Sequence, residues 1–373
     1  MTEDHSLLLG IEVRGTGLHP AAWRRPDSRA EEVFDAAYWV DAAVAADAAG
    51  IDLLFLPDSF DVAASTGRER GQLDAVATAA RVVTATDSIG ILPEVTVTHT
   101  EPFHTSKAIA SLDFASQGRA GWTVGLTRDR AQARLFGRKD VQDDRSLWDE
   151  AAESVEVVRA LWDSWEDDAE IRDAATGRFI DRDKLHYIDF AGEHFSVKGP
   201  SITPRPPQGQ PLVTVRADGS DGIEVAARHG DLIRIQAPVL ASAREIRSDI
   251  RARVGELGRD PDRIRVLLDL DVHIDRTVAA ADQAVAELNR WSGEDRTAST
   301  EQYIGDPNGL TELLSWVAES DIADGVVLRP LAVPAALPWL DDVVSPLRRP
   351  RTVANQTLRG RLGLPRPTNR FAA

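Results

Sequence analysis

IGILPEVTVTHTEPFHTSKAIASLDFASQGRAGWTVGL, residues 89–126, contains two apolar runs separated by a helical pattern. The runs at 89–97 and 120–126 are dense in Val, Ile and Leu, as is typical of parallel strands buried on both faces. Residues 104–116 form the helical pattern, which stops close to Gly118, a common helix terminator. The stretch therefore predicts a strand, a helix and a second strand in succession.

The same alternation continues along the whole chain. Further strand-like runs lie at 7–13, 52–57, 211–217, 231–236, 264–274 and 325–330. Helical patterns lie at 33–49, 72–86, 147–165, 221–229, 241–257, 279–291 and 309–320. Eight strand–helix units predict an α/β fold, a closed (β/α)8 TIM barrel. An open doubly wound sheet is the alternative, but it should carry a Gly-rich turn after its first strand, and residues 14–26 contain no GxGxxG.

Two segments depart from the alternation. Residues 164–210 are charged and then rich in Pro and Gly, which predicts an insertion between the fourth and fifth strands, outside the barrel wall. The stretch from about 346 is basic and contains several prolines, and we expect it to be a tail lying over the barrel. We therefore expect one barrel domain over residues 1–373.

Composition excludes several classes of protein. The chain has 60 acidic and 43 basic residues and a net charge of −17, so it should repel phosphate backbones, and we expect no nucleic-acid partner. It has no cysteine, which excludes disulfides, cysteine-ligated zinc and iron–sulfur clusters. No secretory signal or membrane-spanning run is recognisable, and we expect a cytoplasmic protein. P-loop, HExxH and GxSxG motifs are absent, and so is a nicotinamide-binding fingerprint.

In such a barrel, chemistry takes place where the strands end and their loops begin. His19 and His99 lie in the loops after the first and third strands and are the candidate catalytic residues. Asp58 follows the second strand directly, where its carboxylate can accept hydrogen bonds from a ligand or cap a helix. Both interpretations of Asp58 remain open at this point.

The segment RADGSDG, residues 216–222, lies at a strand end and opens a helix. Gly219 and Ser220 can present backbone amides to a phosphate at the helix N-terminus, and Arg216 can add positive charge. Asp218 and Asp221 would oppose an anion there. An ordinary capped loop is the alternative interpretation.

The run LDLDVHID, residues 268–275, places Asp269, Asp271, His273 and Asp275 on one face of a strand. Same-face neighbours on a strand are separated by roughly 7 Å steps, which suit no single ion. We therefore predict no metal site, and expect a polar face turned to solvent or to the barrel mouth.

Longer stretches of the chain resemble a known family. They include GIDLLFLPDS (50–59), EPFHTSKAIASLDFASQGRAGWTVGLT (101–127), GRFIDRDKLHYIDFAGEHFSVKGPSITPRPPQGQP (177–211), AARHGDLI (226–233) and LRGRLGLPRPTNRF (358–371). In these segments the chain resembles the luciferase-like flavin monooxygenases, within the branch of the nitrilotriacetate, EDTA and dibenzothiophene-sulfone monooxygenases.

The resemblance implies a barrel that uses reduced flavin mononucleotide (FMN) and molecular oxygen to oxidise a small organic substrate. It also implies a separate flavin reductase and a homodimer. Two alternatives are an oxidoreductase that uses a deazaflavin, and a diverged, non-catalytic flavin-binding partner subunit.

The resemblance also assigns cofactor-binding positions, several of which carry unusual residues. Asp58 matches the family's aspartate after the second strand. Glu94 falls where the family has a small or hydroxyl residue near the flavin ring, and Asp144 and Trp148 replace an HxxxY pair. The serine of the phosphate loop falls at Gly219 or Ser220. The predicted cofactor site thus comprises Asp58, Glu94, Asp144, Trp148, Arg216, Gly219 and Ser220.

Overall fold

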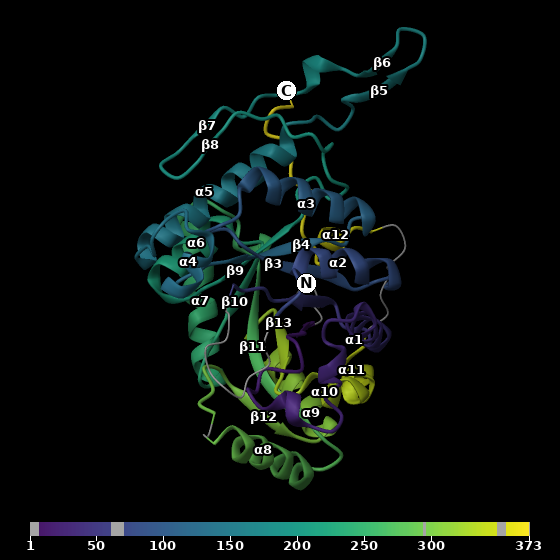
Figure 1. Ribbon diagram of the computed structural model, residues 1–373, viewed down its shortest axis with the longest axis vertical. Helices are drawn as coiled ribbons and strands as arrows, with labels where there is room; N and C mark the ends of the chain where they lie inside the picture. The colour runs from purple at the N-terminus through teal and green to yellow at the C-terminus, as the bar shows by residue number, and fades with distance from the viewer. Residues whose placement is uncertain (1–6, 61–70, 294–295, 349–355, 373) are drawn as a thin grey trace.

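Eight parallel strands close into a barrel in the computed structural model, which describes residues 7–60, 71–293, 296–348 and 356–372 (Figure 1). In chain order the barrel strands are β1 (Leu8–Glu12), β2 (Leu53–Leu56), β3 (Gly90–Thr96), β4 (Gly121–Gly125), β9 (Leu212–Arg216), β10 (Leu232–Ile235), β11 (Arg265–Ile274) and β13 (Gly325–Pro330). Each strand pairs with the next, and β13 pairs with β1, so no barrel edge is left open. The predicted closed barrel is confirmed, and the open sheet is excluded.

Helices follow the strands as the apolar periodicity predicted. The main ones are α1 (Ala36–Ala49), α2 (Ala75–Val82), α3 (Pro102–Ala115), α5 (Asp144–Asp163), α6 (Gly219–His229), α7 (Leu240–Glu256), α8 (Val278–Ser292) and α9 (Pro307–Glu319). Short helices α10 (Val333–Ala336), α11 (Leu340–Val344) and α12 (Leu358–Arg361) follow the last strand. Short elements were not predicted from the sequence, among them α10 to α12, α4 (Arg130–Phe136) and the strand β12 (Gln302–Gly305). β12 pairs only with the far end of β11, outside the barrel ring.

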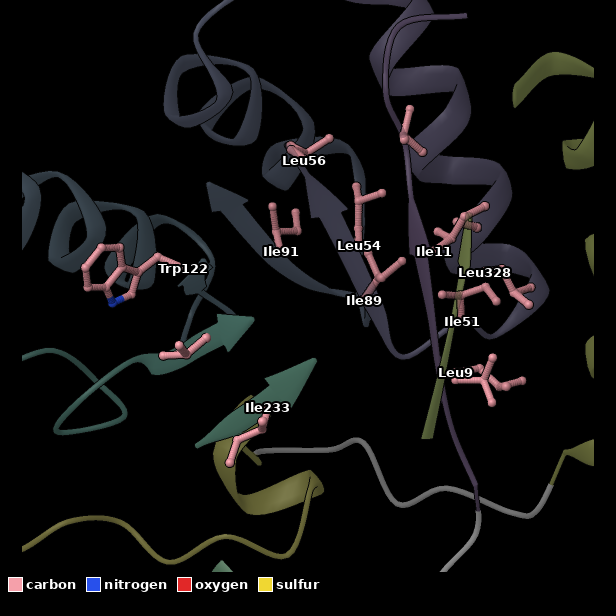
Figure 2. Packing of buried hydrophobic residues seen from close by; sticks show 14 of the residues in the cluster. Leu9, Ile11, Ile51, Leu54, Leu56, Ile89, Ile91, Trp122, Ile233 and Leu328 are labelled. Atoms are coloured by element: carbon pink, nitrogen blue, oxygen red, sulfur yellow. The ribbon is translucent and has the colours of Figure 1, made fainter. Parts of the chain in front are cut away.

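The main apolar core lies between the strands and the surrounding helices. Figure 2 shows Ile11, Leu54 and Leu328, from three neighbouring strands, close together in this cluster. These side chains are at most 1% exposed, as expected for strands covered by helices on their outer face. Burial of this surface is the main favourable term in folding.

The barrel interior is divided into an apolar half and a charged half. The apolar half lies at the N-terminal ends of the strands and includes Leu53, Leu92, Leu212, Leu232 and Leu267. Glutamate, aspartate and arginine side chains occupy the half nearer the C-terminal ends, where loops form the mouth. The charged half therefore lies where barrel enzymes carry out their chemistry.

The C-terminal tail closes the apolar end of the barrel. Leu358, Leu362 and Leu364 belong to the interior apolar cluster, and Leu358 lies so near Gly90 that a Cβ at Gly90 would be 2.5 Å from it. Arg359 holds the tail in place through a bidentate ion pair with Asp231, at 3.0 and 3.3 Å. The predicted tail thus packs into the end of the barrel as well as over it.

The segment between α5 and β9 contains two hairpins, β5 (Glu170–Asp173) with β6 (Arg178–Ile180), and β7 (Phe190–Ala191) with β8 (Ser196–Val197). Neither hairpin pairs with the barrel strands. Figure 1 shows both at one end of the molecule beside the C-terminus, with α8 and β12 at the opposite end. The boundaries of a single domain over 1–373 stay a prediction. Within the described ranges, the helices are all too short or too polar to cross a membrane.

We predict that Leu358→Ala lowers the free energy of unfolding by about 2–5 kcal/mol, because the tail leucine is 1% exposed and its loss leaves a cavity in the barrel interior. Urea unfolding followed by tryptophan fluorescence measures the change. Leu135→Ala is the matched control, since Leu135 is 58% exposed and should change stability by less than about 0.5 kcal/mol. Equal effects of the two substitutions would show that the tail does not seal the barrel.

Candidate active site at the barrel mouth

Ion pairs connect opposite walls of the barrel interior. Arg234 on β10 binds Glu12 of β1 at 2.8 Å and Asp269 of β11 at 2.7 Å. Arg216 at the end of β9 makes a bidentate contact with Glu94 of β3, at 3.0 and 3.2 Å, and lies 3.8 Å from Glu12. The contacts of Arg234 with Glu12 and of Arg216 with Glu94 join strands that are not neighbours in the sheet, so these charged groups lie inside the barrel.

The chain of ion pairs continues toward the end of β11. Arg329 of β13 lies 3.4 Å from both Asp269 and Asp271, and Arg296 forms an ion pair with Asp271. At the other side Arg14 lies 3.6 Å from Glu12 and is half exposed. We name the whole set the mouth network: its carboxylates are Glu12, Glu94, Asp269 and Asp271, and its guanidinium groups are Arg14, Arg216, Arg234, Arg296 and Arg329.

Mutual attraction keeps Glu12 and Arg216 charged although both are buried, whereas burial raises the pKa of Asp271 despite Arg329 and Arg296. Burial alone would raise the pKa of Glu12, but Arg234, Arg14 and Arg216 hold it well below its usual range. Burial likewise opposes the charge on Arg216, yet Glu94 and Glu12 raise the pKa of its guanidinium above the ordinary value. Each charge is tolerated because its partners are present, and removing one partner would leave an expensive uncompensated charge.

Glu94 and Arg216 were predicted separately, at the flavin ring and at the phosphate, and the structure brings them together. Gly125 on β4 makes this possible, because a Cβ there would lie 2.8 Å from the Glu94 Oε1 atom. The guanidinium of Arg216 turns into the barrel toward Glu94 and Glu12. It does not point along the 218–221 loop that the sequence predicted it would serve.

Asp58 caps a helix while also lying at the mouth. Its Oδ2 accepts the backbone N–H of Ala75, the first residue of α2, at 2.9 Å, and its Oδ1 accepts from Gln72 at 3.2 Å. Burial raises its pKa to about 6, with Asp74 and Glu94 adding repulsion. Of the two interpretations that the sequence left open, the capping contact is the one seen, and one carboxylate can serve both roles.

His99 lies in an aromatic group after β3. Its ring stacks on Phe136 of α4 with centroids 4.3 Å apart and planes 9° apart, and Phe60 packs edge-on at 6.2 Å. Both ring nitrogens are buried without a hydrogen-bond partner among the described residues. Burial and the nearby Lys139 lower the pKa of His99, so the ring is neutral at pH 7 and offers one donor and one acceptor.

Arg128 contacts two predicted residues of α5, Asp144 and Trp148. Arg128 forms a 3.0 Å ion pair with Asp144 and lies over the Trp148 ring, with its Cζ atom 5.6 Å from the ring centroid. The indole, 2% exposed, packs against Gly222 in the first turn of α6, where a Cβ would lie 2.8 Å from it. The Trp148 Nε1 atom has no partner among the described residues.

The N-terminus of α6 carries the predicted phosphate loop. Gly219 has φ +68°, a conformation that favours glycine, and both Gly219 and Ser220 are exposed. Asp218 occupies the N-cap position but makes no side-chain capping hydrogen bond. The first amides of α6 are thus turned outward, where an anion is favoured by the helix dipole.

Both ring nitrogens of His19 have hydrogen-bond partners, unlike those of His99. Its Nδ1 atom accepts the backbone N–H of Ala21 at 3.1 Å, so its Nε2 carries the proton and donates to Asn289 Oδ1 at 3.0 Å. The ring is 2% exposed and fastens the loop after β1 to α8. This arrangement is structural, and the catalytic assignment of His19 stays a prediction without geometric support.

Thr127, Arg128 and Arg329 lie at strand ends, where the sequence predicts chemistry, whereas Arg234 and Arg296 of this mouth were not predicted. Arg128 and Thr127 follow β4 directly, and the buried Thr127 hydroxyl has no partner among the described residues. Arg296 and Arg329 approach only through the fold. Position at a strand end was the available signal for Thr127, Arg128 and Arg329, whereas nothing in the local sequence marked Arg296.

Comparisons with known proteins agree with this geometry. The family model described as "Luciferase-like monooxygenase" matches residues 16–327. N-acetyl-S-(2-succino)cysteine monooxygenase of Bacillus subtilis (strain 168) is 28% identical, with 98% of each chain covered. Nitrilotriacetate monooxygenase component A of Aminobacter aminovorans is 31% identical over 75% of this chain and 65% of its own, so the chain spans slightly less than two thirds of that relative. The predicted resemblance is confirmed, and the relatives indicate an oxidoreductase of the monooxygenase type.

Solved structures are similar over almost the whole chain. EDTA monooxygenase from Chelativorans sp. BNC1 has a TM-score of 0.86 at 23% identity, covering 97% of this chain and 99% of its own, and supports the fold. A riboflavin lyase with modified FMN and riboflavin has a TM-score of 0.84 at 26% identity, covering 96% of each chain.

We predict strong coupling between Glu94 and Arg216. Arg216→Met should lower the free energy of unfolding by about 3 kcal/mol, because it leaves the 7%-exposed Glu94 without its main partner. The Glu94→Gln/Arg216→Met double variant should be more stable than the sum of the single changes implies, by about 1–3 kcal/mol. A cycle on the exposed Arg290–Glu287 pair, joined at 3.1 Å, is the control and should give at most about 0.5 kcal/mol. Additive effects at Glu94 and Arg216 would contradict the pairing.

His273 should make stability depend on pH. Burial and the Arg25 guanidinium lower its pKa to about 4, below the ordinary value of about 6.5, so the unfolded chain binds a proton that the folded chain refuses. Its contribution is complete above about pH 6.5 and falls as pH drops toward 4. The stability difference between native protein and His273→Gln should therefore shift by about 2 kcal/mol between pH 7.5 and 5, against the native protein. Denaturant unfolding at both pH values measures it, and a pH-independent difference would refute the buried neutral state.

Proposed function

The chain belongs to the luciferase-like monooxygenase family, and we propose that it is the oxygenase component of a two-component flavin system. In this proposal it binds reduced FMN delivered by a separate flavin reductase and uses molecular oxygen to oxidise a small organic substrate. The observation that carries the proposal is the row of buried, unpartnered polar atoms at the barrel mouth, on His99, Thr127 and Trp148.

The donor set fits a flavin mononucleotide. At one end the outward amides of α6 and the Arg128 guanidinium suit a phosphate dianion. At the other end the unpartnered groups of His99 and Thr127 can hydrogen-bond the carbonyl and N–H groups of a flavin ring. Trp148 lies between Arg128 and α6 and offers an indole N–H near the phosphate end. A bound flavin would thus complete the hydrogen bonding of protein groups at both ends of the site.

Two acidic residues that depart from the family's pattern, Glu94 and Asp144, are each paired with an arginine. Glu94 would be repulsive as an isolated carboxylate near a flavin, but its bidentate contact with Arg216 neutralises it. Asp144 is similarly paired with Arg128. In the proposal Arg128 therefore replaces Arg216 as the cation near the phosphate, while Gly219 and Ser220 supply backbone amides.

Bound reduced FMN would supply the electrons that activate oxygen, and the protein would position and protect the reaction. The stacked rings of His99, Phe136 and Phe60 would exclude water from one side of the mouth. Asp58, whose pKa of about 6 lies near neutrality, could take up or release a proton at its carboxylate close to the mouth. These are the roles in which protein groups assist a cofactor that carries the chemistry.

The reductase is proposed because the sequence carries no nicotinamide-binding fingerprint, so electrons must arrive with the flavin. The relative named as component A of nitrilotriacetate monooxygenase supports a multi-component arrangement. A homodimer is proposed from the resemblance alone. A deazaflavin oxidoreductase and a non-catalytic flavin-binding subunit remain the alternatives.

Anaerobic titration tests the proposal. We expect reduced FMN to change its absorbance on binding, and to bind at least about tenfold more tightly than reduced riboflavin, which lacks the phosphate. Arg128→Gln should reduce this preference, because it removes the cation proposed to lie near the phosphate.

Arg130→Gln is the matched control, since Arg130 is an exposed arginine two residues further along and should leave both affinities unchanged. Equal affinity for the two flavins in native protein would remove the phosphate site. Tighter binding of a deazaflavin than of FMN would favour the deazaflavin alternative. Mixing the reduced-FMN complex with ¹⁸O₂ and candidate substrates, with mass spectrometry of the products, separates an oxygenase from a flavin-binding subunit.

A further inference from the structure

The segment that connects β4 to α5, residues 128–143, lies at the barrel mouth with little packing of its own. It carries the short helix α4, and Ala133 is its only fully buried residue. Among the described elements, no helix or strand packs extensively against α4. A segment with so few buried contacts opens at a low cost in free energy.

Two partly buried contacts, one aromatic and one ionic, fasten this segment to the mouth. The Phe136 ring stacks on His99 with centroids 4.3 Å apart and meets Phe60 edge-on at 4.6 Å. Three residues further on, Lys139 forms an ion pair with Glu150 of α5 at 2.5 Å, and the Glu150 side chain is only 6% exposed. Burial strengthens such a pair, because less solvent screens the two charges.

Unpartnered polar atoms lie under or beside this segment. The ring nitrogens of His99, the hydroxyl of Thr127 and the indole N–H of Trp148 are all buried, without a hydrogen-bond partner in the described ranges. Phe136 covers the His99 ring, Arg128 lies over the Trp148 ring, and Thr127 directly precedes the segment. Buried polar groups of this kind are uncommon and are often completed by a ligand. Because these atoms are buried, a ligand reaches them only after part of their cover moves.

We propose that this segment is a lid, closed in the arrangement described here, which opens to admit the cofactor. Its two latches are the stack of Phe136 on His99 and the ion pair of Lys139 with Glu150. Gly137 lies between the latches with φ +63°, and a Cβ there would meet no atom of the described chain within 4 Å, so the backbone can turn at this point. The proposal rests on the proposed function, since the groups beneath the lid are those assigned to the flavin.

Carbethoxylation of histidines by diethyl pyrocarbonate tests the opening in flavin-free protein. The reagent attacks unprotonated imidazole nitrogens, and peptide mass spectrometry gives the rate at each histidine. At pH 7 we expect His99 to react more slowly than His104, which is exposed on α3. It should react at least about tenfold faster than His19, which is buried with both ring nitrogens hydrogen-bonded and has no lid above it.

Lys139→Gln should raise the rate at His99 at least about fivefold, because it breaks the ionic latch. Burial and Lys139 both lower the pKa of His99, so loss of Lys139 alone would leave less neutral imidazole and slow the reaction. Faster reaction therefore reports opening. Arg138→Gln is the matched control in the same segment, since Arg138 and Glu101 lie 3.5 Å apart with both side chains at least 67% exposed, and it should change the rate less than about twofold.

Circular dichroism and the unfolding midpoint establish that each variant folds. If Lys139→Gln is unfolded, the Lys139→Gln/Glu150→Gln double variant decides, because it removes the latch without leaving a buried charge. The double variant should show the same acceleration at His99.

Reduced FMN gives a second measurement at a residue outside the site. Arg128 is both the first residue of the lid and the proposed phosphate contact, so bound FMN should hold the lid closed. Tryptic cleavage after Arg134, which is exposed on α4, should then slow at least about fivefold, since cleavage requires local opening.

The lid is overturned if His99 reacts no faster than His19 or as fast as His104, if the Lys139 and Arg138 variants have equal effects, or if FMN binds without slowing cleavage after Arg134. Absence of FMN binding, with His99 still responding to the Lys139 latch, would instead reject the proposed cofactor and leave the lid in place.

Discussion

The buried charges of the barrel interior constrain the rest of the structure, because none of them is tolerable alone. Arg234 sits between Glu12 and Asp269, and Arg216 sits between Glu94 and Glu12, so each charge on one wall requires a partner on another. Such pairs gain stability only when their geometry is good, and breaking one leaves an uncompensated charge. The strands that carry these residues must therefore keep their register around the ring.

The division of the interior into two halves follows from the same constraint. Burying charged groups against apolar side chains is costly unless the charges are paired. The apolar residues of the interior lie at the opposite end of the strands. That end is open in an isolated barrel, and Leu358, Leu362 and Leu364 of the tail fill it. The tail is also held by a buried ion pair, between Arg359 and Asp231. Burial alone would raise the pKa of Asp231, but Arg359 and Arg159 lower it to about 2.

At the mouth the hydrogen bonding among the described residues is incomplete. The ion pairs deeper in the barrel satisfy one another, whereas His99, Thr127, Trp148, Arg296 and His273 retain unpartnered atoms at the strand ends. Polar groups left unsatisfied at a barrel mouth are common where a ligand completes the hydrogen bonding.

The sequence alone determined the elements and their order, because strand burial and helix amphipathicity are local patterns of period 2 and 3.6. It predicted all eight barrel strands and the main helices, and the quoted motifs identified the family. Strand ends, which are readable from the pattern, pointed to Asp58 and Arg216, whereas Glu94 and Trp148 were assigned by the resemblance to the family. Only the tertiary structure decided which of these side chains touch. The contacts of Glu94 with Arg216, of His19 with Asn289 and of Arg296 with Asp271 join residues that are separated in the sequence. Such contacts depend on the tertiary fold, which no local pattern encodes.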